Sequence, residues 1–160
     1  MADKTVYLDS SATVKRYLVE GGSEAVDALY HRAEAGDLQL AFSQWNLGEV
    51  LGAFAKAQRR GMITAREMET ASWTFIRETL KLRGLRALRL FPVRGDLLAR
   101  AIPLLFRHGL GQADALQIAS SKELAATALI TADQSLLRAA RAEGLSALDP
   151  TIDRRGIETL

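Results

Sequence analysis

Hydrophobic residues occur along the chain alternately as short continuous runs and as helical repeats. The short runs predict strands at about residues 6–8, 38–42, 86–93, 128–131 and 146–148. Between them, apolar residues spaced three and four apart predict helices at about residues 10–18, 23–35, 44–61, 64–83, 94–107, 111–124 and 134–142. Strands that alternate with helices in this way are typical of an α/β fold around a mainly parallel sheet.

Capping residues support several of these boundaries. Ser43 is a favourable N-cap for the helix that follows it, and Thr64 with Glu67 forms a capping-box pattern at the start of the next helix. The chain contains no internal repeat, low-complexity stretch or linker. We therefore expect one domain over residues 1–150, followed by a polar tail over residues 151–160 that is either loose or docked on a partner.

Composition narrows the class of protein. With 160 residues, 48% of them hydrophobic and 25% charged, the chain is long enough to bury a core as one globular domain. It contains no cysteine, which excludes disulfides and cysteine-based zinc sites. The start of the chain has no signal-peptide pattern, and no run of about 18 apolar residues occurs that could cross a membrane. The cytoplasm is therefore the expected location.

Three aspartates are predicted to meet at one edge of the sheet. Asp9 directly follows the first strand, and Asp133 follows the strand at 128–131. Asp114 lies in the first turn of a helix whose N-terminus should face the same edge. Ligands of open parallel sheets bind at the carboxyl ends of the strands, where the strand order reverses. Each aspartate taken alone is also explained by helix capping or by the helix dipole.

Glu49 is a fourth acidic candidate, and capping does not explain it because it lies inside a helix. It borders the apolar face and has no cationic partner three or four residues away, although a solvated surface glutamate remains the alternative. Carboxylates that converge raise one another's pKa and cost stability unless a cation binds. Mg²⁺ and Mn²⁺ prefer oxygen ligands, so a purely acidic set fits either ion better than zinc.

Four segments carry a resemblance to a known family. They are Tyr7–Ser11, Asn46–Val50, Gln112–Ala119 and Ile130–Asp133. In this order and spacing they resemble the PIN-domain family, and among its members the VapC-type toxins, over roughly residues 5–150. The resemblance implies a three-layer α/β/α sandwich with a parallel sheet of about five strands.

The resemblance also implies a metal-dependent endoribonuclease that hydrolyses RNA phosphodiester bonds with Mg²⁺ or Mn²⁺. The catalytic and metal-binding residues it implies are Asp9, Glu49, Asp114 and Asp133. Thr131 would orient these carboxylates through a hydrogen bond, and Ser10 or Ser11 could help in the same way. The positions after Asp133 hold no further acid, so a fifth ligand is not expected.

The basic residues that we expect to hold the RNA backbone are Lys15, Arg16, Lys56 and Arg60, for each of which a solvated helix end is the alternative. Setting aside four of the 19 acidic side chains leaves 15 against 21 basic ones, a net charge of +6 on the rest of the chain, which suits a polyanionic substrate.

The resemblance to toxins implies two protein partners, a small antitoxin and a second copy of the chain in a homodimer. Apolar residues on the third and fourth predicted helices are candidates for those contacts, although core packing is the commoner fate of such residues. They are Met62, Met68, Trp73 and Phe75.

Two other functions compete with the nuclease. The first is a catalytically inactive PIN-like module that binds RNA or a protein. The second is a phosphate-handling α/β domain. A response-regulator receiver needs paired acids after the first strand, where this chain has Asp9 followed by two serines. A haloacid-dehalogenase-type phosphatase needs Asp-x-Asp, and this chain has Ser11 at the position of the second aspartate. Glycine-rich nucleotide-binding loops are also absent from the sequence.

Overall fold

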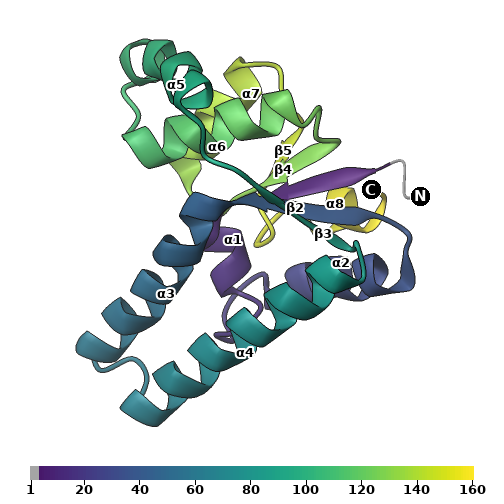
Figure 1. The fold of residues 1–160 in the computed structure, drawn as a ribbon, viewed down its shortest axis with the longest axis vertical. Helices are drawn as coiled ribbons and strands as arrows, with labels where there is room; N and C mark the ends of the chain where they lie inside the picture. Colours follow the sequence, from purple (N-terminus) through teal and green to yellow (C-terminus); the bar gives the residue numbers. More distant parts are fainter. Residues whose placement is uncertain (1–3) are drawn as a thin grey trace.

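The computed structural model describes residues 4–160, so the first three residues of the expected domain lie outside the described part of the chain. A five-stranded parallel sheet in the order β3-β2-β1-β4-β5 forms the centre of the molecule (Figure 1). Its strands are β1 (Thr5–Leu8), β2 (Gln39–Ser43), β3 (Leu88–Phe91), β4 (Ala128–Ile130) and β5 (Ala147–Leu148). This confirms the predicted α/β fold with a parallel sheet.

Helices cover both faces of the sheet and complete the three layers (Figure 1). One face carries α1 (Ser10–Val14), α2 (Ser23–Ala35), α3 (Gln44–Arg59), α4 (Ala65–Gly84) and α8 (Arg154–Glu158). The other face carries α5 (Gly95–His108), α6 (Gln112–Glu123) and α7 (Gln134–Ala142). Between residues 4 and 160, no helix combines the length and the apolar character needed to span a bilayer.

The two faces of the sheet have separate cores because side chains alternate along each strand. In β1, Val6 and Leu8 pack toward α1–α4, whereas Tyr7 packs toward α5–α7. An aromatic cluster fills the first core, where Phe54 and Phe75 meet edge to face with ring centroids 6.4 Å apart. Phe75 is fully buried there, so the structure excludes it as a residue that contacts a partner.

Helix α1 ends at Val14, four residues earlier than the sequence predicts. The amides of Lys15 and Arg16 bond to carbonyls three residues back, at 3.1 Å each, which tightens the chain into a turn rather than extending the helix. This turn decides where the charged side chains at 15 and 16 point.

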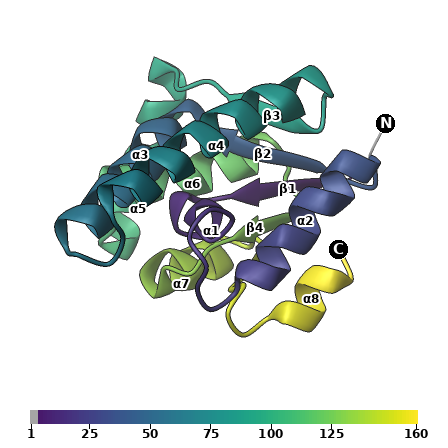
Figure 2. The same ribbon diagram turned by 90° about the horizontal axis from the view of Figure 1, so that it is seen from below.

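The segment 151–160, expected to be a tail, contains a helix that packs onto the domain. Helix α8 lies alongside α2 (Figure 2), and Ile157 on α8 is only 1% exposed and belongs to the core under α1–α4. Arg154 also forms an ion pair with Glu24 on α2 at 2.6 Å. Residues 151–160 therefore pack as part of the domain and do not form a separate tail.

Candidate active site

The point where the sheet changes direction lies between β1 and β4. From β1 the chain continues to β2 and β3 on one side, whereas β4 and β5 lie on the other. Leu8 is opposite Ile130 in register, and the Asp9 amide bonds to the Ile130 carbonyl at 3.1 Å. Asp9 and Thr131 therefore leave the sheet together at the edge where ligands of such folds bind.

Asp9 is a buried carboxylate, 5% exposed, held by three donors. Its Oδ1 accepts the amide of Ala12 at 2.8 Å, which caps α1, and the Ser11 hydroxyl at 2.8 Å. Its Oδ2 accepts the Thr131 hydroxyl at 2.8 Å. Asp9 is thus both a helix cap and a member of the cluster, and its orientation is fixed from both sides.

The hydroxyls of Ser11 and Thr131 connect the segment that follows β1 with the segment that follows β4. Thr131 Oγ1 accepts the Asp133 amide at 3.0 Å, and Ser11 Oγ accepts the Ala132 amide at 2.9 Å. Both hydroxyls thus receive a backbone N–H and direct their own protons to Asp9. Hydrogen bonds of this kind orient a carboxylate, which is the role that the family resemblance implies for Thr131 and Ser11.

Asp133 begins α7 in the same way that Asp9 begins α1. Its Oδ1 accepts the amides of Ser135 and Leu136 at 2.8 and 2.9 Å. The capping explanation therefore holds for Asp133 as well. Capping uses one oxygen, and within residues 4–160 no hydrogen bond reaches the other, which leaves Oδ2 free to contact a ligand.

Glu49 turns toward the other acids. Its Oε2 accepts the Ser10 hydroxyl at 2.5 Å and the Gln117 side-chain amide at 3.2 Å. Gln117 is itself fixed by the buried Tyr7, whose hydroxyl donates to Gln117 Oε1 at 2.7 Å. The alternative of a freely solvated surface glutamate does not fit these contacts.

Gln117 is a site residue that the sequence reasoning missed. It lies on α6 three residues after Asp114, a spacing that places both side chains on one face of the helix. That spacing was the available signal, because a polar residue on the face of a helix that carries a catalytic acid can reach the same site.

Asp114 is half-buried, and within residues 4–160 its carboxylate accepts no hydrogen bond. Its pKa is raised by burial and by the charges of Asp133 and Glu49. Burial raises the pKa of Asp9 to about 6, and the charge of Asp114 adds to this. Asp114 is therefore close enough to each of the other three predicted acids for their charges to repel.

Within residues 4–160, no cationic side chain is paired with these acids. Among the ion pairs formed within the described part of the chain, none includes Asp9, Glu49, Asp114 or Asp133. The donor set consists of oxygens, which suits Mg²⁺ or Mn²⁺. Within residues 4–160, however, no three acidic or imidazole side chains are close enough to hold an ion by themselves.

An oxygen donor set without a closed group of three ligands is what a divalent ion that keeps several water ligands requires. Mg²⁺ in proteins usually takes one or two carboxylates and completes its shell with waters and substrate phosphate oxygens. The residues present therefore fit a hydrated divalent ion. They do not form a closed cage in which all four predicted ligands surround one ion.

Two of the four residues expected to bind RNA are engaged inside the protein. Lys15 is 8% exposed and pairs with Glu20 at 3.1 Å. Arg16 pairs with Glu78 at 2.8 Å and with Asp27 at 2.9 Å. The turn after α1 directs Arg16 toward Asp27 on α2 and Glu78 on α4. Lys15 instead bonds within the loop that precedes α2, at Glu20 and the Gly21 carbonyl. For Arg16 the internal ion pairs do not support a contact with the RNA backbone, and for Lys15 that contact stays a prediction.

Lys56 has the position expected of a backbone contact. It is exposed and lines a groove of about 500 Å³ that also contains Glu49, Ser10 and Ser11. Arg60 is exposed at the end of α3 but does not line this groove. Of the four predicted basic residues, Lys15 and Lys56 both line this groove, and Lys56 is the exposed one.

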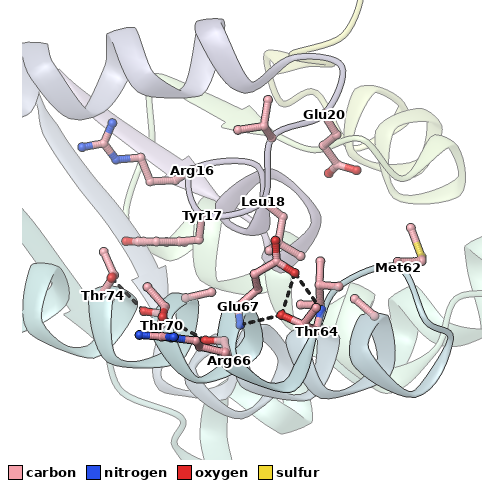
Figure 3. Close-up of a pocket in the computed structure, with 14 residues that line it drawn as sticks. Arg16, Tyr17, Leu18, Glu20, Met62, Thr64, Arg66, Glu67, Thr70 and Thr74 are labelled. Carbon is pink, nitrogen blue, oxygen red and sulfur yellow. Dashed lines mark hydrogen bonds between the residues drawn. The ribbon is translucent and has the colours of Figure 1, made fainter.

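A second, larger groove of about 870 Å³ lies between the turn after α1 and the α3–α4 hairpin (Figure 3). Tyr17 and Leu18 form one wall, and Thr64 and Thr70 on the hairpin side form the other (Figure 3). Met62 also lines this groove and is 71% exposed.

The residues considered as partner contacts divide between this surface and the core. Met62 lines the groove, and Trp73 is exposed elsewhere on α4. Met68 packs against the core, as the fully buried Phe75 does.

The fold and the acidic edge define a PIN domain, and comparison with known families agrees. The family model described as PIN domain matches residues 6–142. The chain belongs to the PIN domain family. Nucleases of this family generally use divalent metal ions. A comparison with curated proteins finds no match.

Solved structures share the fold at low sequence identity. The protein PAE2754 of Pyrobaculum aerophilum is 16% identical, with a TM-score of 0.67 over 98% of this chain and 91% of that chain. VapC20 of Mycobacterium tuberculosis, a toxin that cleaves the sarcin-ricin loop, is 18% identical, with a TM-score of 0.60 over 88% and 95%. VapBC2 of Rickettsia felis, bound to a DNA fragment from its promoter, is 16% identical, with a TM-score of 0.57 over 91% and 98%.

Proposed function

We propose that the protein is an endoribonuclease that depends on Mg²⁺ or Mn²⁺ and hydrolyses RNA phosphodiester bonds. The observation that carries this proposal is the group of four acids at the β1–β4 edge, in which Asp114 is repelled by the other three and none has a cationic partner within residues 4–160. Membership of the PIN family supports it. A bound divalent ion would activate a water molecule and neutralise the phosphate oxygens.

The residues of the chain have distinct roles in this proposal. Asp114 and the free oxygen of Asp133 contact the ion or its waters, because hydrogen bonds within the protein leave them available. Asp9 contributes charge from a position fixed by Thr131. Ser10 orients Glu49 and is not a nucleophile, since no histidine is hydrogen-bonded to it.

We further propose that the protein is the toxin of a toxin–antitoxin pair, acts in the cytoplasm and forms a homodimer. The likeness to VapC20, which is a toxin, supports the first part. The groove beside the α3–α4 hairpin offers an antitoxin apolar walls at Tyr17 and Leu18 next to the charged Arg66 and Glu67 (Figure 3).

Asp114→Asn is the variant that tests the nuclease most cleanly. Asp114 accepts no hydrogen bond within residues 4–160, so its neutralisation leaves the fold intact, whereas changing Asp9 also alters the cap of α1. The matched control is Asp37→Asn, an exposed aspartate between α2 and β2, at the opposite edge of the sheet.

The assay incubates each protein with total RNA in Mg²⁺, in Mn²⁺ and in EDTA. We expect metal-dependent cleavage that leaves 5′-phosphates, a loss on the order of 100-fold or more in Asp114→Asn, and full activity in Asp37→Asn. Cleavage that persists in EDTA or in Asp114→Asn would contradict the proposal. If the wild type cleaves nothing and divalent ions do not raise its melting temperature, the inactive RNA-binding or protein-binding module takes its place.

A further inference from the structure

Trp45 is a large, half-exposed aromatic residue on the helix that carries Glu49. It lies in the first turn of α3, and its side chain is 46% exposed. Its backbone is fixed, because its amide donates to the Ser43 hydroxyl at 3.0 Å. Within residues 4–160 the indole nitrogen donates no hydrogen bond. Single exposed aromatic residues are ordinary in proteins, so exposure alone does not indicate a function for Trp45.

The position of Trp45 is one helical turn before Glu49. At 100° per residue, Trp45, Glu49, Gly52 and Lys56 fall within an arc of about 60° on α3, which we call the α3 strip. Trp45 lies about 6 Å before Glu49 along the helix axis, and Lys56 lies about 10 Å beyond it. Glu49, Gly52 and Lys56 line the same groove as Ser10 and Ser11.

Glycine on this helix opens the surface between Trp45 and Lys56. A Cβ atom added at Gly48 or Gly52 would meet nothing within 4 Å, so packing does not require glycine at either position. Neither backbone has a positive φ, and glycine inside a helix costs about 1 kcal/mol relative to alanine. The effect of both glycines is a bare helix surface on which a flat ligand can approach the backbone next to the acids.

We infer that Trp45 stacks on an unpaired base of the RNA next to the phosphate that is cleaved, and that Lys56 binds a phosphate on the other side of the site. This inference rests on the proposed ribonuclease function. Aromatic side chains stack on bases of single-stranded RNA, whereas a base inside an A-form helix is covered on both faces. Trp45 is thus a positioning residue that requires an unstacked base next to the cleaved phosphate.

Fluorescence tests the stacking directly because the chain contains two tryptophans. In an Asp114→Asn background, which prevents cleavage, Trp73→Phe leaves Trp45 as the reporter and Trp45→Phe leaves Trp73. Trp73 is 59% exposed on α4 and serves as the matched control. Each protein is titrated with an eight-nucleotide single-stranded RNA and with an abasic strand of the same length.

We expect the RNA to quench Trp45 and not Trp73, and the abasic strand to quench neither. In the cleaving protein, Trp45→Ala should raise KM on the order of 10- to 100-fold, with a smaller effect on kcat. Trp45→Tyr should restore most of the loss, and Trp73→Ala should leave KM unchanged. A purely structural role would show no such rescue and no dependence on the bases.

Two results overturn the inference, namely no quenching of Trp45 by the RNA, or equal quenching by the abasic strand. Wild-type cleavage of the same RNA is measured in parallel, with Asp114→Asn as its negative control. Cleavage without quenching removes only the stacking. Quenching without cleavage removes the ribonuclease and keeps the stacking on an RNA-binding domain.

Discussion

The charge on Asp9 destabilises the folded protein when no metal is bound, and pH makes this measurable. Asp9 is buried, and its pKa rises from the ordinary 3.8 to about 6 because burial disfavours the carboxylate more than its hydrogen bonds stabilise it. This difference corresponds to about 3 kcal/mol against the ionised form in the folded state. A divalent cation at the site would offset that cost.

The sign of the pH dependence follows from the two pKa values. The folded protein holds the Asp9 proton more tightly than the unfolded chain, so stability increases as the pH falls through 6 and stops increasing near 3.8. Between pH 7 and pH 5 the gain is about 1.3 kcal/mol. With a urea slope of about 2 kcal/mol per molar, the unfolding midpoint rises by about 0.6 M.

The assay is urea unfolding in EDTA at pH 7 and pH 5, for the wild type and for Asp9→Asn. Every other titrating group is present in both proteins, so the difference between them reports the charge of Asp9 together with its repulsion of Asp114. The strongly acidic carboxyls of Glu143 and Asp96, with pKa values of about 2, stay ionised throughout this range. Adding Mg²⁺ at pH 7 should stabilise the wild type more than the variant.

Asp37→Asn, an exposed change at the opposite edge, should keep the wild-type pH dependence. The contrary result is a wild type that gains no stability relative to Asp9→Asn between pH 7 and pH 5. In that case the charge of Asp9 does not destabilise the folded protein, and the acids need no cation to offset it.

Three further outcomes follow from particular contacts. Arg16→Ala should lower the free energy of unfolding by about 2 kcal/mol, measured in urea, and leave RNA affinity unchanged, because Arg16 pairs with Glu78 and Asp27 inside the protein; a selective loss of RNA binding would reverse this assignment. Lys56→Ala should keep stability and weaken binding of single-stranded RNA, with the slope of log affinity against log salt reduced by about 0.7, and an unchanged slope would exclude a phosphate contact. Ile157→Ala should cost about 2–4 kcal/mol in urea unfolding because its side chain is buried under α2, whereas no loss would mean that the C-terminal helix is not docked in solution.

The sequence alone determined the order of elements and the edge at which the acids meet. Helical and strand periodicity are local properties, and so are caps such as Ser43 and the Thr64–Glu67 box, both of which form in the structure. The convergence of Asp9 and Asp133 also followed from the sequence, because a residue directly after a parallel strand must leave the sheet at its carboxyl edge.

Tertiary packing decided the partners of side chains far apart in the chain. Periodicity predicts that Phe75 faces an apolar surface but not whether that surface is the core or another protein. Similarly, a cation such as Arg16 becomes internal only because α1 ends early and Glu78 lies opposite it. The contact between Gln117 and Glu49 depends on how α6 and α3 meet across the sheet edge. Each of these contacts joins residues on different helices or strands. Hydrophobic periodicity within one helix or strand does not predict how far apart such residues lie, because packing between the elements sets that distance.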